Sequence, residues 1–211
     1  MDVVAQSFWN LDGRVMNCQL EPLAAGRLGS QMRFDVSGPF EINRYGPKQI
    51  ITADSLKSLK EAADNWEVGL SSACGCYVFA VRAGKGYTPH YVGQSCKRSI
   101  LAEALNPRNQ TIYNKVLGET GKGVPVLFLI PMRTPGGKFR KPIEPRSKRR
   151  SFLSVDFLEE WFIAEALRKN PLLCNNRKTK FLRQVHVVGV FNAKKGEATK
   201  ASTQLSKTIW R

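Results

Sequence analysis

The chain has 211 residues, of which 42% are hydrophobic and 24% charged, a composition typical of globular proteins and unlike that of disordered or fibrous ones. At roughly 150 residues per domain, this length corresponds to one domain, or to one domain with a sizeable extension. The 33 Lys and Arg residues outnumber the 17 Asp and Glu residues, so the net charge is +16, which favours a polyanionic partner.

The positive charge is confined to the second part of the chain. Residues 1–70 carry 7 basic and 9 acidic side chains, whereas residues 71–211 carry 26 and 8, a net charge of +18. We therefore expect a domain at 71–211 that binds a phosphate-rich partner, preceded at 1–70 by a mixed N-terminal extension to which the sequence assigns no role. The alternative is a basic surface without a specific partner.

The cysteines and apolar segments predict a soluble, cytoplasmic protein. The five cysteines include no Cys-x-x-Cys pair, and with only two histidines neither a zinc cluster nor a disulfide framework is expected. The chain opens without a basic leader, and its longest apolar run, 124–131, is far shorter than the ~18 residues that span a bilayer. We expect no membrane association, and the sequence leaves the oligomeric state open.

Periodicity predicts a helix and a hairpin in the first half of the chain. Short strands joined by turns are expected over 1–50, and a helix over 53–66, where Leu56, Leu59, Ala63 and Trp66 share one face. The β-branched and aromatic segments 76–81 and 87–92 flank a glycine-rich turn and predict a β-hairpin, with Tyr77, Phe79 and Val81 on one face.

Helices are expected over 97–105 and 110–117, on either side of Pro107, and an apolar strand buried on both faces over 123–130. Further along, the sequence predicts a helix over 151–170 with Ser154 as its N-cap, a strand over 185–191 and a helix over 198–207. The fold class is therefore α/β of the α+β kind, a small, mainly antiparallel sheet flanked by helices.

A basic loop at 133–150 separates the apolar strand from the long helix. It is rich in Pro and Gly, contains one acidic residue, and is expected to contribute nothing to a core. A mobile cationic loop beside a nucleic-acid site would have this composition, and so would a tract that binds RNA or another polyanion by itself. We expect its cations to bind nucleic acid: Arg140, Lys141, Arg146, Lys148, Arg149 and Arg150.

Tyrosines and glycines are paired at the ends of the two hairpin strands, as Gly75-Cys-Tyr77 and Tyr91-Val-Gly93. Two tyrosines on neighbouring strands can direct their hydroxyls to one point, and a glycine permits close approach of the backbone. Two aromatic residues that simply pack a sheet are the alternative. In the helix over 151–170, Glu159 lies at the edge of the apolar stripe, where either a divalent cation or a basic neighbour would balance its charge.

These features, in this order, resemble the GIY-YIG nuclease superfamily over about residues 74–176. The resemblance also includes the strand at 124–130, the helix that carries Glu159, and the segment from Asn170-Pro171 to Asn175. It implies metal-dependent endonuclease activity, on DNA rather than RNA, with Mg²⁺ or Mn²⁺ held by Glu159. Tyr77 would accept or relay a proton from the attacking water, and Tyr91 would orient the water or the phosphate.

The resemblance also implies supporting roles for Gly75, Gly93 and Asn175, although Asn175 by itself reads as a turn former. A tyrosine with a pKa near 10 is a poor base at neutral pH unless a nearby cation lowers that pKa.

The chain departs from the family where an arginine is expected two turns after the Tyr-x-Gly, because Leu101 stands there beside Glu103. Lys97, Arg98 or Arg108, the last with Tyr113 nearby, are candidates for its role. If none of them fills it, the alternative is a nucleic-acid-binding or assembly module without turnover.

Overall fold

The computed structural model describes residues 32–148, 150–176, 179–191, 193 and 195–209, together with two short strands, β1 (Phe8–Trp9) and β2 (Val15–Met16), which pair antiparallel. The chain divides into two compact units, Met1–Gln31 and Met32–Arg211. A boundary at residue 70 is therefore wrong, because the elements between residues 32 and 70 belong to the larger unit.

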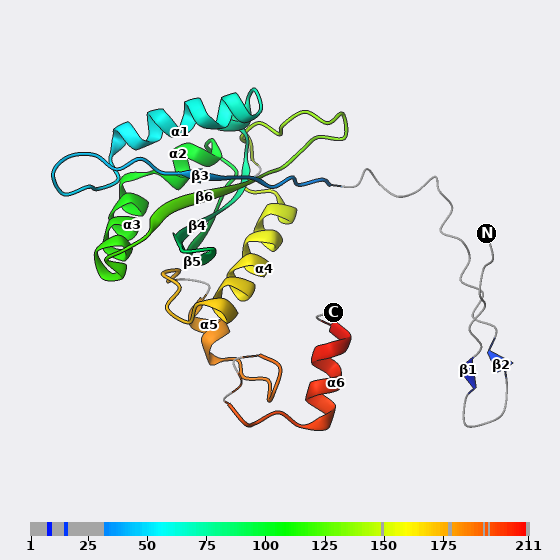
Figure 1. The fold of residues 1–211 in the computed structure, drawn as a ribbon. Coiled ribbons are helices and arrows are strands. Elements are labelled where there is room, and N and C mark those ends of the chain that lie inside the picture. The colour runs from blue at the N-terminus through cyan, green and yellow to red at the C-terminus, as the bar shows by residue number, and fades with distance from the viewer. Residues whose placement is uncertain are drawn as a thin grey trace. The chain divides into compact units, whose positions relative to one another are not determined.

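The larger unit is built on a four-stranded antiparallel sheet with the strand order β3-β6-β4-β5 (Figure 1). The strands are β3 (Ser37–Glu41), β4 (Gly75–Ala83), β5 (Gly86–Ser95) and β6 (Val124–Pro131). The predicted hairpin is β4–β5, and the predicted buried strand is β6, which lies inside the sheet. These elements confirm the α+β fold class.

Helices cover both faces of the sheet. On one face, α1 (Ala53–Trp66), α2 (Ile100–Ala104) and α3 (Pro107–Thr120) pack on the alternate β4 residues Tyr77, Phe79 and Val81. On the other face, α4 (Leu153–Lys169) packs on the intervening residues Cys76 and Val78. The alternation that the sequence predicts for β4 is therefore confirmed.

Local capping explains where the helices begin. The side chain of Thr52 accepts a hydrogen bond from Asp54 and caps α1, and Asn106 caps α3 with Pro107 as the first helical residue. The helix predicted from 97 begins only at Ile100, because Ser99 is its N-cap. Trp66 was expected on the buried face of α1, but it is 60% exposed and touches Phe40 only edge-on.

Three other expectations for the second half are wrong. Ser154 does not cap α4, whose N-cap is Phe152, and its hydroxyl is buried without a partner among the described residues. The segment 185–191 is a turn closed by a bridge between Val187 and Phe191, and no strand among the described residues pairs with it. The basic loop does contribute to the core, through the buried Ile143.

Shorter elements complete the unit: the 3-10 helix η1 (Leu70–Ser72), α5 (Thr179–Gln184) and α6 (Lys200–Ile209). No helix in the described part of the chain combines the length and the apolar character that crossing a membrane requires.

Candidate active site

The two motif tyrosines lie side by side on one face of the β4–β5 hairpin. Tyr77 is directly opposite Gly93, and Phe79 is opposite Tyr91, so both aromatic residues of the motifs face the helices α2 and α3. The rings of Tyr77 and Tyr91 are stacked, with centroids 6.3 Å apart and an interplanar angle of 26°. Tyr77 is buried, whereas Tyr91 is half-buried.

Neighbouring atoms lie so close to Gly75 and Gly93 that a larger residue would overlap them. A Cβ atom at Gly93 would lie 2.3 Å from the hydroxyl oxygen of Tyr77, because the Tyr77 ring crosses the strand at this residue. At Gly75, φ is +151°, and a Cβ atom would lie 2.2 Å from the carbonyl oxygen of Ile130. The supporting role expected for both glycines therefore has a steric cause.

Asn175 holds the outer edge of β5. Its side-chain carbonyl accepts the Val92 N–H at 2.9 Å, and its amide nitrogen donates to the Val92 carbonyl at 2.6 Å. Val92 stands between Tyr91 and Gly93 on a strand with no neighbour on that side in the described sheet. Asn175 thereby replaces the missing strand and fixes the backbone of the Tyr-x-Gly motif.

The Tyr77 hydroxyl is held by Asn109, a residue of α3 that the sequence analysis did not single out. One amide group of Asn109 donates to the hydroxyl of Tyr77 and to the backbone carbonyl of Glu103, each at 2.9 Å. Asn109 is only 2% exposed. A polar residue on the buried face of a helix, one turn after its N-cap, was the signal that could have revealed it.

Glu159 lies on α4, which packs on the other side of the sheet. Gln94, which follows Gly93, donates to Asp156 at 2.8 Å, so the first turns of α4 lie against the end of β5. Glu159 is one turn beyond Asp156. Burial raises the pKa of Tyr77 and Tyr91 most, and the negative charge of Glu159 adds to that rise.

Burial is the main cause of the raised pKa values of Tyr77 and Tyr91. Desolvation raises the pKa of Tyr91, and the charge of Arg108 opposes that rise. Desolvation also raises the pKa of Tyr77 well above its ordinary value, with nearby Tyr91 and Glu103 adding to the effect. Both phenols are therefore protonated at neutral pH, and a base role for Tyr77 would need a cation to overcome its burial.

Among the candidate cations, Arg108 is the one whose charge acts on a motif tyrosine. It is exposed, in the first turn of α3. Lys97 and Arg98 instead line a hollow with Arg150. Tyr113 is fully buried and stacks on Phe79 with ring centroids 3.9 Å apart, so it lies in the core and out of reach of a substrate.

The donors around the tyrosine pair suit a hard cation. The side chains of Glu159 and Glu103 offer carboxylate oxygens, and that of the half-buried Tyr91 offers a hydroxyl oxygen, whereas the Tyr77 hydroxyl is buried and already bonded to Asn109. Magnesium commonly takes one or two carboxylates and keeps several waters. Within the described ranges no three His, Cys, Asp or Glu side chains gather, which excludes a dense ligand cage there but not this sparse arrangement.

His90 is half-buried. It lies where the register of β4 and β5 shifts, between the pairs Phe79–Tyr91 and Ala80–Pro89. Its Nδ1 is 3.4 Å from the amide nitrogen of Asn170, and burial lowers the pKa of its imidazole. Its contacts are those of a structural residue beside the bulge.

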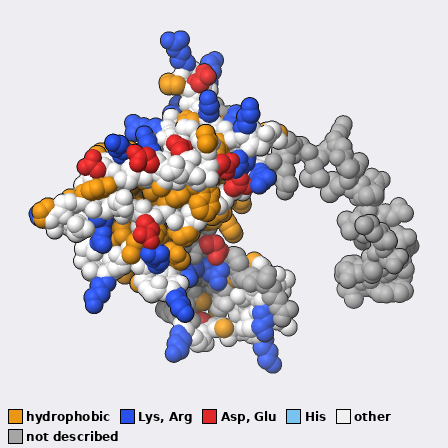
Figure 2. Space-filling model, turned by 45° about the horizontal axis from the view of Figure 1, so that its top comes forward, with side chains coloured by type: hydrophobic (Ala, Val, Ile, Leu, Met, Phe, Trp, Pro, Cys, Tyr) orange, Lys and Arg blue, Asp and Glu red, His pale blue; other side chains and the backbone are white. Residues whose placement is uncertain are grey.

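The cations of the basic loop differ in their surroundings. Arg140 is half-buried, with its guanidinium 5.1 Å from the centre of the Phe152 ring, whereas Lys141, Arg146, Lys148 and Arg150 are exposed. Arg149 lies outside the described residues. On the face drawn in Figure 2, lysine and arginine side chains project around the periphery instead of forming one patch.

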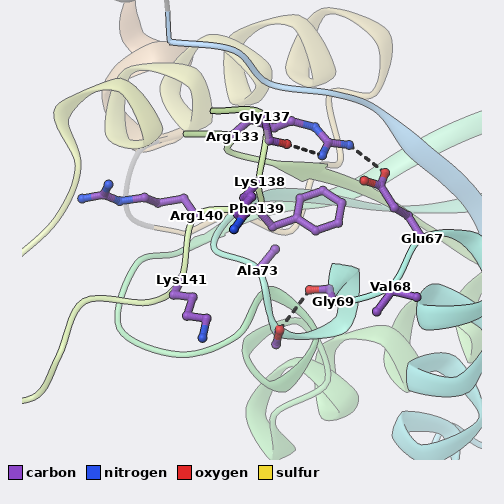
Figure 3. Close-up of a pocket in the computed structure, with 11 residues that line it drawn as sticks. Glu67, Val68, Gly69, Ala73, Arg133, Gly137, Lys138, Phe139, Arg140 and Lys141 are labelled. Carbon is purple, nitrogen blue, oxygen red and sulfur yellow. Dashed lines mark hydrogen bonds and ion pairs between the residues drawn. The ribbon is translucent and has the colours of Figure 1, made fainter. Parts of the chain in front are cut away.

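Arg133, at the start of this loop, has a structural role. It binds the carboxylates of Asp35 and Glu67 and the carbonyl of Gly137, and it lies 4.2 Å from the centre of the Phe139 ring. Figure 3 shows the contacts of Arg133 with Glu67 and Gly137. They lie at the wall of a hollow of about 370 Å³. None of the residues lining this hollow belongs to the tyrosine pair or its neighbours.

Comparison of the chain with family models, curated proteins and solved structures found no match. The functional assignment therefore depends on the residues themselves.

Proposed function

We propose that this protein is a GIY-YIG-type endonuclease that hydrolyses phosphodiester bonds of nucleic acid, with DNA as the preferred substrate. The observation that carries the proposal is the stacked pair of Tyr77 and Tyr91 on the hairpin. The hydrogen bond from Gln94 to Asp156 holds α4, the helix of Glu159, against β5, the strand of Tyr91. The charge of Glu159 contributes to the raised pKa of both tyrosines, after the larger effect of burial.

Arg108 and Tyr91 are the groups best placed to contact a phosphate. Arg108 is exposed at the N-terminus of α3, and its charge acts on the half-buried Tyr91. A positioned cation stabilises the negative charge that develops on a phosphate during in-line attack. Arg108 thus supplies the charge that the family's missing arginine would have supplied, and the Tyr91 hydroxyl orients the phosphate or the water.

Tyr77 acts as a positioning residue in this proposal. The hydrogen bond from Asn109 holds its oxygen in place, and burial raises its pKa, so the phenol keeps its own proton. Its ring stacks beside Tyr91 and passes over Gly93, which fixes the ring of Tyr91 and the strand that carries it.

Glu159 would hold the cation, which is Mg²⁺ or Mn²⁺ because the surrounding donors are oxygens. When bound, such a cation neutralises charge on the phosphate and favours ionisation of water at neutral pH. Among the described residues, Cys74, Cys76, Cys96 and Cys174 form no disulfide. This is compatible with a reducing, cytoplasmic location, which we also propose.

Cleavage assays with Glu159→Gln test the proposal. Supercoiled plasmid, single-stranded DNA and RNA are incubated with the full chain in Mg²⁺, in Mn²⁺ and in chelator. We expect metal-dependent cleavage that Glu159→Gln reduces by about 10² or more and that Glu160→Gln, the exposed neighbouring residue, leaves unchanged. Equal cleavage by the two variants, or no cleavage of any substrate, would refute the assignment.

A non-catalytic nucleic-acid-binding module is the second candidate. Tyr77 is 1% exposed, and a glutamate, Glu103, stands near the position where the family has its arginine. This candidate predicts salt-sensitive binding without cleavage, and binding that Glu159→Gln does not weaken.

A further inference from the structure

A hollow of about 320 Å³ lies where the end of β5 meets the basic loop. Lys97 and Arg98, which follow β5, line it together with Arg150 from the far end of the loop. Glu103 is the one carboxylate among the described residues of its lining. The backbone carbonyl of Glu103 accepts the amide of Asn109, which also holds Tyr77, so the hollow adjoins the tyrosine pair.

Backbone contacts fix the two walls of this hollow. The hydroxyl of Ser95 donates to the carbonyl of Arg98 at 2.7 Å and closes the turn that carries Lys97. The N–H of Ile143 donates to the carbonyl of Cys96 at 2.7 Å, and the Ile143 side chain is buried. The basic loop is therefore anchored beside the turn.

Among the described residues, none forms a hydrogen bond or ion pair with the side chains of the three cations Lys97, Arg98 and Arg150. Like charges around one hollow repel each other, and a bound anion removes that repulsion. The planar guanidinium group matches the oxygens of a phosphate, and here two arginines face the same space.

We propose that the hollow formed by Lys97, Arg98 and Arg150 beside Glu103 binds a backbone phosphate of a nucleic-acid strand, adjacent to the phosphate at the tyrosine pair. The hollow is at the small end of the range for ligand pockets, which suits one phosphate group rather than a whole nucleotide. The identity of the ligand as nucleic acid rests on the proposed function.

Binding measured in chelator separates this proposal from catalysis. Fluorescence anisotropy follows a labelled oligothymidylate with the full chain over a range of salt concentrations. The test variant is Lys97→Ala/Arg98→Ala/Arg150→Ala. The control variant, Lys57→Ala/Lys60→Ala/Lys122→Ala, removes the same charge from exposed positions away from the hollow. Inorganic phosphate serves as a competitor.

We expect the test variant to bind about tenfold or more weakly than the control, with a log–log salt slope smaller by ~0.7, the value for one lost phosphate contact on a single strand. Equal affinity and slope for the two variants would overturn the proposal, whether or not the protein cleaves DNA. If the hollow affects only the binding of inorganic phosphate, the nucleic-acid assignment is wrong. A reduced slope, together with no cleavage of any substrate in the separate assays with Mg²⁺ or Mn²⁺, would support the phosphate site and refute the nuclease.

Discussion

The side-chain amide of Asn109 donates a hydrogen bond to the hydroxyl of Tyr77 across 2.9 Å, in the buried layer between α3 and the hairpin. This contact holds the tyrosine in place. Desolvation raises the pKa of Tyr77 well above its ordinary value, and the hydrogen bond from Asn109, which lowers that pKa, does not offset the rise. Tyr91 is only half-buried, and the charge of Arg108 opposes the rise that burial causes in its pKa.

Removing the hydroxyl group from each of two buried tyrosines should have different effects on the free energy of unfolding. The Tyr113 hydroxyl has no partner in the described part of the structure, so Tyr113→Phe should leave stability unchanged or raise it by about 1 kcal/mol. Tyr77→Phe removes the Asn109 contact and should lower stability by about 1 kcal/mol. Urea denaturation measures both. A loss in Tyr113→Phe as large as that in Tyr77→Phe would show that the hydroxyl of Tyr113 is paired.

Stability should fall as the pH rises above about 10, the ordinary pKa of tyrosine. Burial raises the pKa of Tyr77, Tyr91 and Tyr113 in the folded protein. The unfolded chain then releases protons that the folded protein retains, so unfolding becomes more favourable with increasing pH. Denaturation between pH 8 and 11 tests this, and the slope should be shallower in Tyr113→Phe. A pH-independent midpoint over that range would contradict it.

Gly93→Ala should destabilise the hairpin by roughly 1–3 kcal/mol, because the new methyl group would overlap the ring of Tyr77. Gly118→Ala is the matched control: this glycine lies in α3 with open space around it, and alanine there should stabilise by about 0.5–1 kcal/mol. Thermal unfolding of the two variants measures the difference. Equal midpoints would mean that the Tyr77 ring does not lie across Gly93.

Asn175→Ala should lower stability by roughly 2–4 kcal/mol, because it leaves the buried N–H and carbonyl of Val92 unpaired. Asn176→Ala changes the adjacent, exposed asparagine and should have little effect. Hydrogen exchange offers a local readout, since the Val92 amide should lose protection in the first variant alone. Unchanged protection there would refute the role given to Asn175.

Arg133 and Lys138 lie in the same basic loop, but only Arg133 is expected to contribute to the stability of the fold. Arg133→Ala should cost roughly 3–5 kcal/mol of stability, since the largely buried side chain binds both Asp35 and Glu67. Lys138→Ala, which removes an exposed cation, should leave the denaturation midpoint within error. Urea denaturation distinguishes these outcomes, and a negligible loss in Arg133→Ala would show that the ion pairs are solvent-exposed.

The sequence by itself determined the sheet and most of the helices around it. The alternation of β4, the apolar run of β6 and the spacing of Leu59 and Ala63 in α1 are local patterns that follow from the periods of strands and helices. They fail at Trp66, which is exposed, and over 185–191, with which no strand in the described part of the chain pairs.

Tertiary structure alone decided the chemistry of the candidate site. No periodicity reveals that Asn109 reaches the oxygen of Tyr77, or that Lys97 and Arg98 meet Arg150 at one hollow. These contacts join residues distant in the chain, and only the folded arrangement sets their burial and mutual charge effects. Burial and neighbouring charge determine whether a phenol holds or gives up its proton, so sequence could name the tyrosines but not assign their roles.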